Sequence, residues 1–125
     1  MLPFKLSCTL TLPLVDGQPS VSLPFNFVGQ FKERILLDES FTGAGTLAIP
    51  MTLIGAPGAL LIVLEHVAMP DAAPILVKYN GASQGKELAP GSADLYVNLA
   101  PSAGVTSISF DYTAPGRVRA WILGG

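Results

Sequence analysis

The sequence has few charged residues. Its 125 residues include only 7 basic and 9 acidic side chains, so charged residues make up 13%, about half of the roughly 25% of a typical globular domain. Hydrophobic residues make up 50%. This combination excludes intrinsic disorder, which needs low hydrophobicity and many charges. The net charge of −2 provides no basic surface for nucleic acid. The length predicts one domain over residues 1–125.

Histidine and cysteine each occur once, as His66 and Cys8. One cysteine forms no intramolecular disulfide, and one histidine with one cysteine does not supply a metal site. A catalytic triad would have to include His66, whose neighbour Glu65 points to the opposite face of a strand. Cys8 is expected to be buried as a small hydrophobic residue. We therefore expect no enzymatic activity, no metal and no cofactor.

Targeting and membrane segments are not evident. The first residues alternate apolar and polar side chains, unlike the apolar core of a secretory signal, so synthesis in the cytoplasm is expected. No charged residue occurs from Ser40 to Leu64, but Pro50 and Pro57 interrupt this stretch and would break a spanning helix. We expect two buried strands instead, Thr46–Ile54 and Ala59–Leu64, joined by a turn at Gly55–Gly58.

Alternation with a period of two residues dominates the rest of the chain. In the first strand, Phe4, Leu6, Cys8, Leu10 and Leu12 share one face. Asn80-Gly81 is a strong hairpin signal, and Pro24 restricts its strand to an edge or interrupts it. The segment from Arg34 to Ser40 fits a strand better than a short helix. The further strands are expected at Val21–Phe27, Ile75–Tyr79, Gly85–Leu88, Leu95–Leu99, Ile108–Tyr112 and Arg117–Leu123.

These eight or nine short strands, with little or no helix, predict an all-β protein. The expected architecture is a single antiparallel β-sandwich, similar to a jelly roll.

The last strand carries the clearest candidate binding residues. Arg117, Arg119 and Trp121 share one face, opposite a face of smaller aliphatic side chains. Tryptophan and arginine are enriched at binding hot spots. If the aliphatic face is the core, Trp121 points outward; the alternative, Trp121 in the core, is equally compatible with the pattern. Tyr96 is expected outward on its own strand, opposite Leu95, so the candidate interface is Tyr96, Arg117, Arg119 and Trp121.

The shortage of charge also bears on assembly. A monomer with so few surface charges is prone to association, whereas a subunit that always lies in an assembly needs fewer. The composition therefore favours a homo-oligomer or a protein that docks onto a larger lattice.

Several runs resemble small β-sandwich virion proteins of tailed bacteriophages. They are Gly58–Glu65, Ala73–Gly81, Glu87–Gly91, Gly104–Phe110 and Val118–Leu123. The resemblance covers roughly residues 58–124 and consists of strands and turns, without a catalytic signature. It implies a capsid decoration (cement) protein that oligomerises and binds the major capsid protein on the virion surface, without nucleic acid or membrane partners.

Two other functions remain open at this stage. A small tail, baseplate or fibre component belongs to the same class of virion structural protein. A carbohydrate-binding module belongs to a different class, and Trp121, Tyr96 and Asn98 would then form its aromatic and polar platform.

Overall fold

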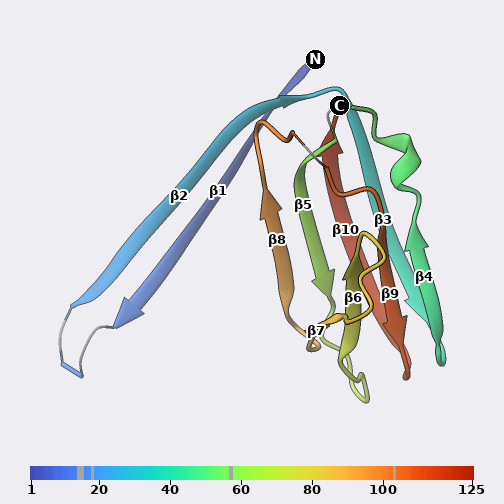
Figure 1. Cartoon of the computed structure of the whole chain (residues 1–125). Coiled ribbons are helices and arrows are strands. Elements are labelled where there is room, and N and C mark those ends of the chain that lie inside the picture. Colours follow the sequence, from blue (N-terminus) through green and yellow to red (C-terminus); the bar gives the residue numbers. More distant parts are fainter. Residues whose placement is uncertain (14–15, 18, 57, 103) are drawn as a thin grey trace. The chain divides into compact units, whose positions relative to one another are not determined.

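The computed structural model describes residues 1–13, 16–17, 19–56, 58–102 and 104–125. The chain forms two compact units, Met1–Phe31 and Lys32–Gly125. The single domain expected over residues 1–125 stays a prediction. The described residues contain ten strands and one short 3₁₀ turn (Figure 1). The strands are β1 (Leu2–Pro13), β2 (Ser20–Phe31), β3 (Glu33–Phe41), β4 (Gly45–Ile49), β5 (Ala59–His66), β6 (Ile75–Tyr79), β7 (Lys86–Leu88), β8 (Ala93–Val97), β9 (Ile108–Tyr112) and β10 (Gly116–Gly124), and the turn is η1 (Met51–Leu53).

The first unit is a long antiparallel hairpin of β1 and β2. Directly paired residues of two antiparallel strands project from the same face, and here the pairing gathers nearly all apolar side chains on one face. This apolar hairpin face consists of Leu2, Phe4, Leu6, Cys8, Leu10 and Leu12 from β1 and Val21, Leu23, Phe25, Phe27, Gly29 and Phe31 from β2. The opposite face is mainly polar, and Ser7 donates a hydrogen bond of 3.0 Å to Asn26 across it.

The hairpin confirms the predicted alternation of the first strand but corrects the expectation for Cys8. Cys8 lies on the apolar hairpin face as predicted, yet it is exposed. The reason is that the described residues of this unit contribute only two strands, which provide no second layer to cover the face. Part of the turn predicted at Val15–Pro19 lies outside the described residues.

The second unit is a sandwich of two four-stranded antiparallel sheets, with strand orders β3-β10-β5-β8 and β4-β9-β6-β7. The strand pairs β3·β10, β4·β9, β5·β8 and β6·β7 are nested, so the chain behaves as one long ribbon folded back on itself at the β6–β7 turn. Wrapping that ribbon brings β10 beside β5 and β9 beside β6, which is the strand arrangement of a jelly roll. The predicted all-β, jelly-roll-like sandwich is confirmed.

The tip of this ribbon is the predicted Asn80-Gly81 turn. Asn80 and Gly81 have φ angles of 54° and 68°, and Ala82 donates a backbone hydrogen bond of 3.1 Å to Tyr79. Positive φ at both central residues matches the right-handed twist of the flanking strands. The turn then lets Val77 pair with Lys86 of β7.

The core lies between the two sheets and is built from alternate residues of each strand. Ile62, Phe110, Ala120 and Ile122 have no exposed surface, and Leu64, Ile75, Val77, Ile108 and Val118 are nearly as buried. Two stacked rings also join the sheets: Phe41 of β3 lies 3.9 Å, centroid to centroid, from Tyr112 of β9. Each ring lies over a glycine of the neighbouring strand. A Cβ at Gly116 would lie 2.8 Å from the Phe41 ring, and a Cβ at Gly45 would lie 2.9 Å from Tyr112 Oη.

His66 ends β5 and is fully buried on the core side. Its Nδ1 lies 3.0 Å from the carbonyl oxygen of Leu88. A carbonyl only accepts, so Nδ1 donates this hydrogen bond, and Nε2 has no hydrogen-bond partner among the described residues. His66 and Glu65 point to opposite faces, as their adjacency predicted.

The uncharged stretch Ser40–Leu64 forms the end of β3, then β4, η1 and β5. The predicted strand Thr46–Ile54 is too long, because Pro50 ends β4 and the next residues form η1. Ala59–Leu64 lies in β5 as predicted, and Pro57 of the predicted turn lies outside the described residues. In the part of the chain that the structure describes, no helix is long and apolar enough to cross a membrane.

Candidate binding interface

The outward face of the β3-β10-β5-β8 sheet carries a row of apolar side chains across all four strands. Trp121 of β10 pairs with Leu36 of β3 on one side and Val63 of β5 on the other. Val63 in turn pairs with Leu95 of β8. Paired residues project from the same face, so these four side chains form a continuous band, here called the apolar stripe.

The apolar stripe is open to solvent. Leu36 is 60% exposed, Leu95 47% and Trp121 37%, and Val63 is partly buried. Single exposed leucines are ordinary on protein surfaces, but a contiguous apolar band is a feature of binding surfaces. Trp121 at the middle of the band provides a large and rigid side chain of the kind that anchors interfaces.

A row of paired charges borders the stripe on one side. Arg119 lies between Asp38 and Glu65 in the strand pairing, and its Nε donates a hydrogen bond of 2.6 Å to Glu65 Oε1. Arg117 binds Asp38 through two parallel hydrogen bonds, from Nε to Oδ1 at 2.7 Å and from Nη2 to Oδ2 at 2.5 Å. These four charges cancel, so the border is polar but carries no net charge.

The two arginines have different relations to their neighbours. The hydrogen bond with Arg117 lowers the pKa of Asp38 below its ordinary value, and the same contact raises the pKa of Arg117. The guanidinium carbon of Arg119 lies 5.3 Å from the centroid of the Trp121 ring, within the range of a cation–π contact. Arg119 therefore holds both its ion-pair partner and the indole ring in place, which limits the freedom that Trp121 would lose on binding.

Three of the four predicted interface residues lie on this face. Arg117, Arg119 and Trp121 point outward, while Val118, Ala120 and Ile122 fill the core. This outcome settles the orientation of Trp121, which the sequence left open. Whether these residues bind a partner stays a prediction.

Tyr96 corrects the prediction for β8, because it points inward. It pairs with the fully buried Ile62 and packs against the core, while Leu95 takes the outward position. Tyr96 and Trp121 therefore lie on opposite faces of one sheet. The platform of Trp121, Tyr96 and Asn98 that a carbohydrate site would need is not assembled.

Leu36, Val63 and Leu95 were missed as interface residues by sequence reasoning. They lie 27 and 32 positions apart along the chain, and only the strand order brings them into one row. The sequence does show apolar residues in both alternating sets of β3 and β8. Alternation alone does not decide which of the two sets faces the core and which faces solvent.

A cluster of polar side chains ties the two sheets together at the edge formed by β8. Asp94 of β8 accepts hydrogen bonds from Tyr79 Oη of β6 at 2.7 Å and from Lys86 Nζ of β7 at 2.6 Å. Burial by itself would raise the pKa of Asp94, but the hydrogen bonds from Lys86 and Tyr79 outweigh it, and the pKa is lowered. Burial, followed by the contact with Asp94, raises the pKa of Tyr79. A cavity of about 430 Å³ is lined by these residues together with Tyr96.

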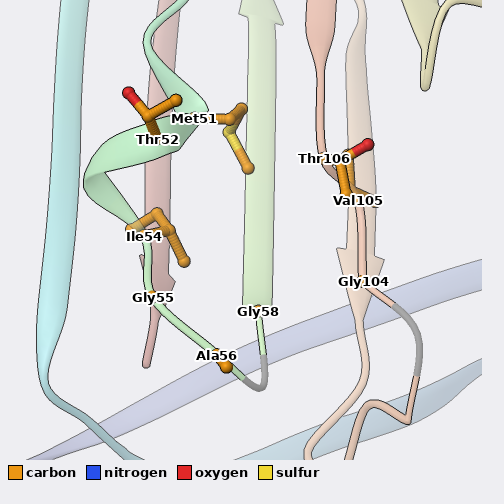
Figure 2. A pocket seen from close by; sticks show the side chains of 9 residues that line it. All are labelled: Met51, Thr52, Ile54, Gly55, Ala56, Gly58, Gly104, Val105 and Thr106. Carbon is orange, nitrogen blue, oxygen red and sulfur yellow. The ribbon is translucent and has the colours of Figure 1, made fainter.

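A second cavity, of about 360 Å³, opens at the end of the sandwich that carries η1 (Figure 2). Met51 and Ile54 line it from the segment around η1, and Val105 and Thr106 line it from the segment before β9. No charged residue is among the described residues that line it. Within the described ranges, no three His, Cys, Asp or Glu side chains lie close enough together to hold a metal ion. The two cavities therefore differ: ionisable side chains of Tyr79, Lys86 and Asp94 line the first, whereas the described lining of the second has none.

No protein-family model, no curated protein and no solved structure matches this chain in the comparisons made.

Proposed function

We propose that this chain is a non-enzymatic structural protein of a tailed-phage virion. In this proposal it is a capsid decoration protein that docks on the major capsid protein lattice through the outward face of the β3-β10-β5-β8 sheet. The observation that carries the proposal is the apolar stripe, with Trp121 at its centre and a neutral row of ion pairs at its border. The jelly-roll fold, common in viral capsid proteins, and the resemblance of residues 58–124 support it.

The stripe suits docking for a physical reason. Binding would remove Leu36, Trp121 and Leu95 from water, and apolar burial is the main favourable term in most protein association. The paired arginines and carboxylates keep their partners at the rim, so docking would not leave a charge buried and unpaired. A protein that binds only the folded, assembled lattice stabilises it by mass action.

The test is binding to shells assembled from the major capsid protein of the phage that encodes this chain. We expect the wild-type protein to co-sediment with these shells. Leu36→Asp and Leu95→Asp each place a charge in the stripe and are expected to weaken binding at least tenfold, since a charge would have to be desolvated.

Leu76→Lys is the control. Leu76 is 40% exposed on the outward face of β6, in the other sheet, and pairs with Glu87 and Asp111, so a lysine adds a charge at similar exposure without like-charge repulsion and away from the stripe. Its binding should equal that of the wild type. Failure of the wild type to bind shells, or equal loss in all three variants, would reject the docking surface. Recovery of the chain with purified tails would place it in the tail, the other virion role considered.

A further inference from the structure

The apolar hairpin face is a second exposed apolar surface, in a different unit from the apolar stripe. Leu10, Leu12, Leu23 and Phe25 on this face are each 43–46% exposed, and none of its twelve residues is charged. A two-stranded hairpin is at best marginally stable in water unless its apolar face packs against something. The hairpin therefore requires a covering layer.

Prolines interrupt the outer edges of the hairpin. In an antiparallel pair, N–H groups point alternately toward the paired strand and toward the free edge. Pro24 has no N–H to donate to β1, so its nitrogen faces the free edge of β2. The register pairs Pro24 with Thr9. Pro3 and Pro13 are an even number of residues from Thr9 on the same strand, so their nitrogens point in the same direction as that of Thr9. The nitrogens of all three prolines thus face the outer edges, where they remove donors that an added strand would use. The prolines therefore weaken strand addition at Pro24 and at the two ends of β1, whereas a partner over the face would also cover the apolar side chains.

The properties of the face favour a second copy of the same hairpin. The face is uncharged, so two copies meet without repulsion and without the cost of burying a charge. Two strands of 12 residues form a sheet of about 40 Å by 10 Å, at roughly 3.4 Å per residue and 4.8 Å between strands. Two such faces cover about 800 Å² as flat footprints, and protruding leucine and phenylalanine side chains add to the accessible area. That size is near the lower limit of a specific interface.

We propose that two copies of this chain associate through their apolar hairpin faces, which pack face to face as a small four-stranded sandwich. Aligned sheets pack about 10 Å apart at a small angle, which a pair of equal, twisted hairpins satisfies. An interface of this small size is typical of weak association, so we expect a dimer that dissociates on dilution. The biological use of this dimer rests on the proposed function in virion assembly. The dimer itself involves the apolar hairpin face, whereas the proposed docking on the capsid involves the apolar stripe.

The test is sedimentation velocity of the full chain from about 1 to 100 μM, a range that brackets micromolar affinity. We expect a monomer–dimer equilibrium for the wild type. Leu10→Asp and Phe25→Asp put a charge into the apolar hairpin face and should raise the dissociation constant at least tenfold. Thr11→Asp and Asn26→Asp are matched controls, one residue along the same strands on the opposite face, and should change it by less than about twofold.

Cys8 provides an independent readout. It is the single cysteine, is exposed and lies near the middle of β1 on the apolar hairpin face. Two copies packed face to face bring their Cys8 side chains to opposite sides of the same small interface. A short bis-maleimide should therefore yield a covalent dimer with the wild type and with Thr11→Asp, but much less with Leu10→Asp.

The other possible occupants give different results. A wild type that stays monomeric at 100 μM with Cys8 protected from maleimide would show the face covered within its own chain. A monomer with reactive Cys8 would show that the face is uncovered in the isolated chain and does not bind a second copy. A dimer broken by Leu36→Asp but not by Leu10→Asp would assign self-association to the apolar stripe. Each of these results overturns the inference. A dimer that forms as expected but fails to bind shells would instead reject the proposed function alone.

Discussion

The hairpin and the sandwich are built from the same alternation but reach different degrees of burial. In β10, Val118, Ala120 and Ile122 are at most 1% exposed, while in β1 Leu10 and Leu12 are 46% and 43% exposed. The difference lies in the layer opposite the strand. In the sandwich the β4-β9-β6-β7 sheet covers the inward face of β10, whereas the described part of residues 1–31 supplies only two strands. Alternation creates an apolar face, but a second layer is needed to turn that face into a core.

Amide hydrogen exchange should show the largest contrast between the two units. The central strands β5 and β10 open only with global unfolding, which costs at least about 5 kcal/mol in an ordinary domain. At protein concentrations below hairpin association, amides of β1 and β2 should exchange about 10³-fold faster or more. Mass spectrometry of deuterated peptides would measure this ratio. Equal protection of β1 and β10 at the lowest concentration would break the comparison.

Truncation of one phenylalanine in each unit should differ by several kcal/mol. Phe110→Ala removes a fully buried ring from the sandwich core and should lower the free energy of unfolding by about 3–5 kcal/mol. Phe25→Ala removes a ring that is 46% exposed and should cost below about 1 kcal/mol. Urea denaturation followed by the fluorescence of Trp121, the single tryptophan, would report the unfolding of the sandwich. Similar losses in both variants would contradict the distinction.

Removal of the Asp94 charge should have an intermediate, pH-dependent effect on the sandwich. The pKa of Asp94 is lowered in the folded state, so its contribution is fully present above the ordinary value near 3.9 and is lost as the pH falls through the lower folded value. Asp94→Asn should therefore cost about 1 kcal/mol at pH 7. The difference between variant and wild type should shrink below about pH 4. Urea midpoints measured from pH 3 to 8 would test this, and a constant difference would contradict it.

The exposed ion pair of Arg117 with Asp38 should contribute least. Both side chains are largely in solvent, where Coulomb attraction is screened and ordering of two side chains opposes it. Asp38→Asn is expected to leave the urea midpoint of the sandwich unchanged within error, even though the contact lowers the pKa of Asp38. A clear loss of stability would show that the ion pair bordering the stripe stabilises the fold of the sandwich, contrary to this expectation.

Local pattern predicted several elements well. The strands at Ala59–His66, Ile75–Tyr79 and Ile108–Tyr112 have the expected bounds or nearly so, and the Asn80-Gly81 turn joins β6 to β7 as its sequence indicates. These features depend on residues close together in the chain: alternation, proline at a strand end, and a dipeptide that accepts positive φ. The Thr46–Ile54 strand failed because the apolar run continues past Pro50, and apolar runs alone do not distinguish a strand from the turn that follows it.

The amino-acid sequence by itself determined the all-β class and the sets of residues that share a face on each strand. Only the tertiary structure decided which set faces the core. On β8 both sets are partly apolar, so the inward place of Tyr96 and the outward place of Leu95 follow from pairing with β5. The same long-range pairing builds the apolar stripe from four separate strands. Cys8 is exposed because the described residues of its own unit form only two strands. A period of two fixes sidedness within a strand, whereas the choice between its two sides is made by the partner strands and the layer opposite.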